Sequence, residues 1–87
     1  MVKIEMYVTP SCPYCIRAKA LLDRKGVEYE VIDLRQHPER RREMLKRAED
    51  RRSVPQIFIN GRGLGGYDDI VALEQKGELD LLLGISS

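Results

Sequence analysis

The chain has 87 residues, a net charge of +1 and a charged fraction of 33%, with the apolar content of an ordinary globular protein. This length predicts one domain, over residues 1–87, that can fold without structural staples. A net charge so close to zero argues against the strong overall field of a protein that binds nucleic acids or membrane surfaces.

The N-terminus and the cysteines bear on the compartment. The first residues lack the basic and apolar regions of a secretory signal, and no apolar run approaches the roughly 18 residues of a membrane-spanning helix. We therefore expect a cytoplasmic protein with no membrane contact. In that compartment the two cysteines, Cys12 and Cys15, should be catalytic or metal-binding rather than a structural disulfide.

The first predicted elements are a strand and a helix on either side of the cysteines. Apolar residues alternate with other side chains over residues 1–8, which predicts a strand with one apolar face. Residues 9–11 interrupt that pattern, and residues 16–25 predict a helix. Cys12 then lies at or beside the helix N-cap, and Pro13 suits the first turn because proline lacks the N–H that would be unpaired there.

A second strand and a second helix follow. Residues 27–34 predict a strand, and the strand–helix–strand order favours a right-handed parallel crossover. Residues 38–50 predict a helix with few apolar positions, in which Glu43 and Arg47 are spaced to form an i,i+4 pair. The arginines of residues 35–52 could favour an anionic ligand, but we interpret most of them as a solvent-exposed helix face.

The C-terminal half predicts a hairpin and two helices. Residues 56–59 are rich in strand-forming side chains, and Asn60-Gly61 is a tight-turn signal that favours a returning strand near residues 62–65. A third helix is predicted from about Ile70, after capping carboxylates, and a short amphipathic helix over residues 79–83. The order β-α-β-α-β-β-α predicts an α/β fold, a four-stranded mixed sheet with helices on both faces.

Two thiols separated by two residues at a strand-to-helix junction predict a redox-active pair. The thiolate is the nucleophile, and the unpaired N–H groups and positive dipole end of a helix N-terminus stabilise it. Cys12, at the helix start, is the predicted attacking residue, and Cys15, one turn further in, is the predicted resolving residue. We expect no metal site, because only His37 could add a further nitrogen or sulfur ligand.

Three motifs together resemble a known family. Residues 7–15 (YVTPSCPYC), 53–61 (SVPQIFING) and 65–69 (GGYDD) are similar in order and spacing to glutaredoxins, most of all to the short bacterial dithiol type. The resemblance runs from near residue 3 to Leu83. It implies a thioredoxin fold and an enzyme of electron transport and cell redox homeostasis that uses glutathione as a co-substrate, with no permanently bound cofactor.

The resemblance also implies how glutathione is held. The backbone of Val54, which precedes a cis Pro55, would pair with the glutathione cysteine. The family's Gly-Gly-x-Asp turn would bind the γ-glutamyl end, here through Gly66, Tyr67 and Asp68. An acidic side chain in that turn can pair with an ammonium group, while N–H groups at a helix start can bind a carboxylate.

Two further residues complete the predicted groove. Tyr14 would line the groove. A basic residue of the second helix would meet the glycine carboxylate of glutathione, and Arg41 is the best positional match, with Arg40 and Arg42 as alternatives. Many relatives carry a lysine three residues before the first cysteine, where this chain has Thr9. The attacking thiol would therefore depend more on the helix N-terminus.

The predicted activity is glutathione-dependent reduction of protein disulfides and of glutathionylated proteins by Cys12 and Cys15. Two alternatives share the fold: a protein reduced by thioredoxin reductase that donates electrons to ribonucleotide reductase, and a dimer that bridges an iron–sulfur cluster through the first cysteine and glutathione. Pro13 and Cys15 disfavour the cluster. We expect a monomer whose partners are glutathione and disulfide-containing or glutathionylated proteins, with ribonucleotide reductase among the candidates.

Overall fold

In a computed structural model that describes residues 2–49 and 51–85, four strands form one mixed sheet in the order β2-β1-β3-β4. The strands are β1 (Ile4–Val8), β2 (Glu30–Asp33), β3 (Gln56–Ile59) and β4 (Arg62–Gly65). β1 pairs parallel with β2 and antiparallel with β3, and β4 returns antiparallel beside β3. The predicted parallel crossover and the predicted hairpin are both confirmed.

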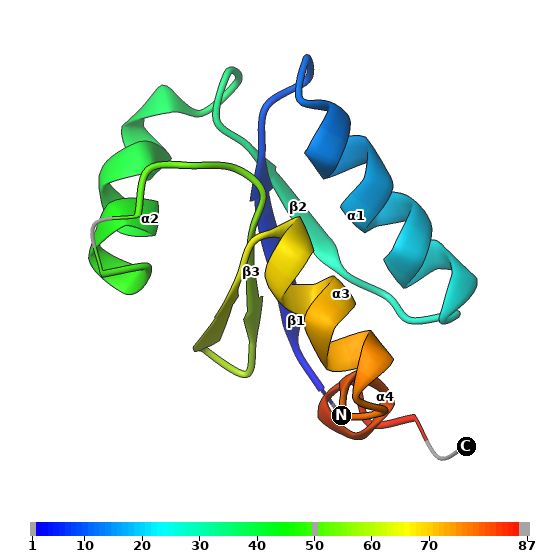
Figure 1. Ribbon diagram of the computed structural model, residues 1–87. Coiled ribbons are helices and arrows are strands. Elements are labelled where there is room, and N and C mark those ends of the chain that lie inside the picture. Colours follow the sequence, from blue (N-terminus) through cyan, green and yellow to red (C-terminus); the bar gives the residue numbers. More distant parts are fainter. Residues whose placement is uncertain (1, 50, 86–87) are drawn as a thin grey trace.

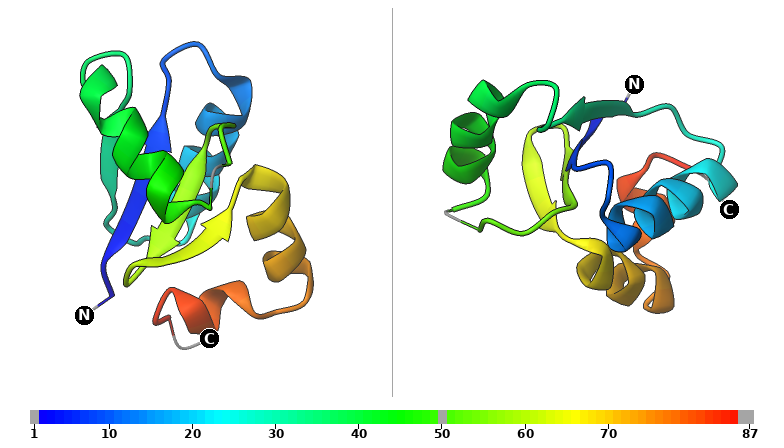
Figure 2. Two further views of the ribbon diagram at one scale, coloured as in Figure 1. Left: turned by 90° about the vertical axis from the view of Figure 1, so that its left-hand side faces the viewer. Right: turned by 90° about the horizontal axis from the view of Figure 1, so that it is seen from above.

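Helices cover both faces of the sheet. α1 (Pro13–Arg24) and α3 (Tyr67–Gln75) lie on one face and α2 (Arg41–Arg47) lies on the other, as Figure 1 and the view from above in Figure 2 show. The short α4 (Leu79–Leu82) adds Leu79 to the apolar cluster beneath α1. The predicted α/β fold is confirmed. Within the described ranges, no helix has both the length and the apolar character needed to cross a membrane.

β1 is buried on both faces, which corrects the prediction of a single apolar face. Ile4, Met6 and Val8 lie in the cluster that α1 and α3 cover. The intervening Glu5 and Tyr7 are only 6% and 0% exposed and contact α2. The alternation in the sequence is real, but β1 is a central strand, so its second face is covered by a helix rather than by solvent.

Arg47 of α2 accommodates the buried carboxylate of Glu5. Its guanidinium donates to Glu5 Oε1 at 2.9 Å, to Glu5 Oε2 at 3.2 Å and to Tyr7 Oη at 2.9 Å. The same guanidinium lies 4.3 Å from the centroid of the Phe58 ring. Bidentate pairing with a carboxylate and stacking on an aromatic face are both properties of arginine that lysine lacks. Arg47 therefore joins α2 to the sheet instead of facing solvent.

The predicted pair between Glu43 and Arg47 is wrong. Glu43 instead pairs with Arg40, whose Nη2 lies 2.8 Å from the Glu43 carboxylate, and it accepts a hydrogen bond from Tyr7. The helix predicted over residues 38–50 is also interrupted, since a short 3-10 helix, η1 (Pro38–Arg40), precedes α2. Its predicted last residue, 50, lies outside the described residues.

The turns agree with prediction better than the element bounds do. β2 is shorter than the predicted residues 27–34, and Met1 of the first predicted strand lies outside the described residues. Gly26 follows α1 with φ of +70°, as expected for a residue that ends a helix. Asn60 and Gly61 have φ of +52° and +82°, the left-handed values that a tight hairpin turn requires.

One cation joins the helices on the cysteine-bearing face. Lys25, at the end of α1, places its Nζ 2.7 Å from Glu74 of α3 and 2.7 Å from Asp80 of α4. Hydrogen bonds to the two carboxylates raise the pKa of Lys25 above its usual value. The three helices are thereby linked at the end of α1 that lies away from the cysteines.

Candidate active site

The cysteine pair lies where β1 leads into α1. Cys12 is the N-cap residue, with extended backbone angles (φ −88°, ψ 113°), and its N–H donates to Thr9 O at 3.3 Å. Pro13 occupies the start of the helix, where its missing N–H leaves no donor unpaired. The N-cap position predicted for Cys12 is confirmed.

The two sulfur atoms have different surroundings. The N–H of Cys15 donates to Cys12 Sγ at 3.2 Å, so the N-terminus of α1 can support negative charge on that sulfur. Cys12 is partly exposed, whereas Cys15 is 1% exposed within the apolar cluster. Burial, and then the hydrogen bond with Cys12, raise the pKa of the Cys15 thiol to about 12. One sulfur is therefore accessible and accepts a backbone N–H, while the other is buried and stays protonated at neutral pH.

The segment before β3 lies directly beside Cys12. The Val54–Pro55 peptide bond is cis, as the resemblance implies, and Val54 O lies 3.5 Å from Cys12 Sγ. β3 begins at Gln56 and pairs with β1, which explains why this segment meets the end of β1. The Gln56 side chain donates from Nε2 to Ser53 O at 2.8 Å and so fixes the approach to the strand.

A cleft of about 220 Å³ brings together all of the predicted glutathione-binding residues except Arg41. The cleft is lined by Tyr14, Arg51, Ser53, Val54, Pro55, Gly66, Tyr67, Asp68 and Asp69. The Tyr14 ring is half exposed, and its centroid lies 6.1 Å from that of Tyr67. A Cβ at Gly66 would lie only 3.3 Å from Pro55 O. The start of α3 and the segment before β3 therefore lie in close contact, and glycine permits that approach.

The first turn of α3 combines acidic side chains with backbone donors. Gly66 is its N-cap residue, and the Gly66 N–H donates to Asp69 Oδ2 at 2.8 Å. That hydrogen bond, and after it the side-chain hydrogen bond from Arg51, hold the pKa of Asp69 below its usual value. Asp68 is exposed beside it. The N-terminus of a helix favours anions, so this turn offers both a carboxylate for a cation and N–H groups for an anion.

Among the residues predicted to bind glutathione, Arg41 is the one that does not line the cleft. It is exposed at the start of α2, on the opposite face of the sheet from α1 and α3. The arginine that lines the cleft is Arg51, from the connection between α2 and β3. Sequence reasoning missed it because several arginines fall within residues 35–52. Its only signal was its position just before the SVP motif at residues 53–55.

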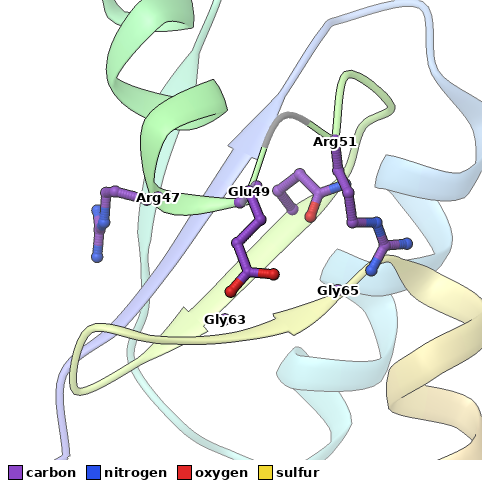
Figure 3. Close-up of a pocket in the computed structure, with 7 residues that line it drawn as sticks. Arg47, Glu49, Arg51, Gly63 and Gly65 are labelled. Atoms are coloured by element: carbon purple, nitrogen blue, oxygen red, sulfur yellow. The ribbon is translucent and has the colours of Figure 1, made fainter.

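A second cleft, of about 180 Å³, adjoins the first and shares Arg51 with it. It lies between the end of α2 and the β3–β4 hairpin (Figure 3). In Figure 3 the Arg51 side chain extends toward Gly65 and the start of α3, whereas the Arg47 side chain points away from both. Among residues 2–49 and 51–85, no group of three or more His, Cys, Asp or Glu side chains is placed to hold a metal ion.

The sequence is similar to that of a known family and of several of its members. The glutaredoxin family profile matches residues 4–64. A probable glutaredoxin of Synechocystis is 51% identical over 81 residues, which cover 93% of this chain and 92% of that protein. Glutaredoxin 3 of Escherichia coli is 47% identical over 83 residues, which cover 95% of this chain and 99% of that protein.

The backbone agrees with solved glutaredoxins. The crystal structure of a buckwheat glutaredoxin–glutathione complex matches with a TM-score of 0.86 and 29% identity, covering 95% of this chain and 81% of that chain. This match confirms the thioredoxin-like sheet, and the sequence matches confirm the resemblance read from the three motifs. The chain belongs to the glutaredoxin family, whose members are glutathione-dependent disulfide oxidoreductases.

Proposed function

We propose that this chain reduces protein disulfides and glutathionylated proteins, with Cys12 as nucleophile, Cys15 as resolving thiol and glutathione as the source of electrons. The observation that carries the proposal is the position of Cys12 Sγ. It accepts the Cys15 N–H at 3.2 Å and lies 3.5 Å from the carbonyl oxygen of Val54, a residue that lines the 220 Å³ cleft. A nucleophilic sulfur and a peptide-sized groove thus adjoin one another.

Reduction of a protein disulfide uses both thiols. The Cys12 thiolate attacks one sulfur of the substrate, which breaks the substrate S–S bond, forms a mixed disulfide and releases one substrate thiolate. Cys15 loses its proton and attacks Cys12 Sγ, releasing the second substrate thiol and leaving a Cys12–Cys15 disulfide. Two glutathione molecules then reduce that disulfide through a Cys12–glutathione adduct and leave as glutathione disulfide, so two electrons pass to the substrate.

Removal of glutathione from a protein needs only Cys12. Its thiolate attacks the glutathione sulfur of the mixed disulfide, the protein leaves as a thiol, and a second glutathione releases glutathione disulfide from Cys12. The buried Cys15 does not enter this cycle. Burial raises the pKa of the Cys15 thiol, which disfavours the thiolate that would otherwise compete with the second glutathione.

The residues lining the cleft suggest how the tripeptide is held. In this proposal the Val54 backbone pairs with the glutathione cysteine beside the cis Pro55. Gly66, Tyr67 and Asp68 hold the γ-glutamyl group at the start of α3. This orientation keeps the glutathione sulfur next to Cys12.

Two further contacts belong to the same proposal. The half-exposed Tyr14 ring covers the groove beside Tyr67. Arg41, at the start of α2 and outside the cleft, stays the residue that the family resemblance suggests for the glycine carboxylate. We also propose that the protein acts in the cytoplasm, because reduction of its disulfide draws on a pool of glutathione that is kept reduced.

Activity measurements on the two cysteine variants test the proposal. Cys15→Ser should still remove glutathione from a glutathionylated peptide but should lose the reduction of protein disulfides. Cys12→Ser should lose both activities, because the remaining thiol is buried. Activity that survives in Cys12→Ser with either substrate would remove Cys12 from its assigned role.

A further inference from the structure

The first turn of α3 presents an electrostatic problem for the ligand of the proposed function, on which this inference rests. Asp68 and Asp69 both lie in that turn, where the γ-glutamyl carboxylate of glutathione is expected to bind. Like charges at such short range repel one another, more strongly where solvent is partly excluded. Asp68 has an assigned partner in the ligand ammonium group. Asp69 has none in the ligand, so its charge has to be offset by the protein.

Arg51 supplies that charge from across the cleft. Its Nη2 lies 3.2 Å from Asp69 Oδ2, the same oxygen that accepts the Gly66 N–H at 2.8 Å. The two donors hold the pKa of Asp69 below its usual value, the Gly66 N–H contributing more. Asp69 is therefore ionised at neutral pH, with one oxygen turned toward a backbone donor and a guanidinium.

Gly65 makes room for this ion pair. A Cβ on Gly65 would clash with the Asp69 carboxylate and would lie 2.7 Å from Arg51 Nη1, and the residue has φ of +97°, which favours glycine. Figure 3 shows the Arg51 side chain reaching Gly65 and the start of α3. The space that a side chain would fill at the end of β4 is thus occupied by a charge pair contributed by two other segments.

We propose that Arg51 is a positioning residue for the γ-glutamyl end of glutathione. It neutralises Asp69 and holds that carboxylate away from the remaining N–H groups of the α3 N-terminus, which are thereby left for the carboxylate of the ligand. Arg51 also stands three residues before Val54, so the pair spans the two walls of the cleft. It acts through Asp69 and takes no part in the chemistry at Cys12.

The exposure of the pair separates this role from a structural one. The side chains of Arg51 and Asp69 are 51% and 46% exposed, and ion pairs in such surroundings contribute little to stability. Loss of Arg51 should therefore leave thermal unfolding almost unchanged and should act on the binding of glutathione.

The test compares Arg51→Gln with Arg52→Gln, a matched control that removes the same charge from the adjacent exposed residue. Initial rates are measured with a glutathionylated peptide as the varied substrate. We expect Arg51→Gln to raise KM about three- to fivefold with kcat unchanged, Arg51→Lys to stay within about twofold of wild type, and Arg52→Gln to match wild type. Equal KM values for Arg51→Gln and Arg52→Gln would overturn the inference, as would a fall in kcat together with a lower melting temperature.

Removal of the unpaired carboxylate gives a second readout. In the double variant Arg51→Gln/Asp69→Asn, the amide oxygen can still accept the Gly66 N–H, and position 69 carries no charge to repel the ligand carboxylate. The KM of this double variant should return toward the wild-type value. For the single variant Arg51→Gln, the ratio of its KM to that of wild type should shrink in high salt, because salt screens exposed charges. If Arg51 bound the ligand directly, Asp69→Asn would restore nothing, which would refute the role through Asp69. A wild-type protein with no glutathione-dependent activity would instead refute the proposed function itself.

Discussion

At the scale of single residues, the division of work between the two thiols follows from their positions on one helix turn. Cys12 caps α1, is partly exposed and accepts an N–H at 3.2 Å, whereas Cys15 points into the apolar cluster and is 1% exposed. The two positions therefore suit the proposed roles of Cys12 as nucleophile and Cys15 as resolving thiol. Sequence spacing and the helix N-terminus were sufficient to predict that Cys12 caps the helix and that Cys15 is the less exposed thiol, while their roles stay a prediction.

Alkylation rates provide a residue-scale prediction. With iodoacetamide at pH 7, we expect Cys12 to react at least about tenfold faster than Cys15, because burial raises the pKa of the Cys15 thiol to about 12 and keeps it protonated. Peptide mapping by mass spectrometry after timed quenching gives both rates. As a control, Cys12 in the Cys15→Ser variant should be alkylated at the same rate as Cys12 in wild type. Equal modification of the two cysteines would contradict the assigned roles.

Prediction from sequence was less successful for the arginines. The periodic pattern of the second helix could place Met44 in the core, but it could not show that Arg47 crosses to a carboxylate on β1, 42 positions earlier in the chain. Arg51 was equally hidden, since its partner Asp69 is 18 positions away, and no local pattern encodes such a pair. The motifs around Val54 and Gly66 located the cleft because their residues are close in sequence and share one family signature.

At the scale of elements, one largely buried ion pair adds to the apolar contacts of Met44 that attach α2 to the sheet. The Glu5 side chain is 8% exposed and that of Arg47 is 26% exposed. Taking charges out of water is unfavourable, and this pair is tolerated because the contact is bidentate and Tyr7 supplies a further hydrogen bond. The element order and a helix on each face of the sheet could be predicted without this contact, but the burial of Glu5 against Arg47 could not.

Replacement of Arg47 gives the element-scale prediction. Arg47→Leu should lower the free energy of unfolding by about 2 to 3 kcal/mol at pH 7, because it leaves Glu5 buried without its cation. Arg42→Leu, on the exposed face of the same helix, should change it by less than about 0.5 kcal/mol. Urea denaturation followed by circular dichroism measures both values, and similar losses in the two variants would disprove the role given to Arg47.

The same pair predicts a pH dependence. The Arg47 hydrogen bond, against the opposing effect of burial, holds the pKa of Glu5 below its usual value of 4.5. A carboxyl with a lowered pKa stabilises the fold fully above its unfolded value and loses that contribution as the pH falls through the folded value. The difference in stability between wild type and Arg47→Leu should therefore be largest near pH 7 and should narrow below pH 4.5. A constant difference across this range would contradict the assignment.

At the scale of the whole molecule, three segments far apart in sequence meet at one end of the sheet. Cys12 lies between β1 and α1, the segment at Val54 precedes β3, and α3 begins after β4. The antiparallel pairing of β3 with β1, and of β4 with β3, brings these points together around one cleft. The sheet therefore builds the site. The order of elements in the sequence predicted the parallel crossover and the hairpin, whereas the pairing of β3 with β1 comes from the structure.

The central claim is that this cleft makes glutathione the reductant of the Cys12–Cys15 disulfide. The most direct measurement starts from the oxidised protein and follows the appearance of its two thiols with either reduced glutathione or NADPH and thioredoxin reductase. We predict reduction by glutathione, with one glutathione disulfide formed for each protein disulfide, and little reduction by thioredoxin reductase. Rapid reduction by thioredoxin reductase, with none by glutathione, would contradict the account.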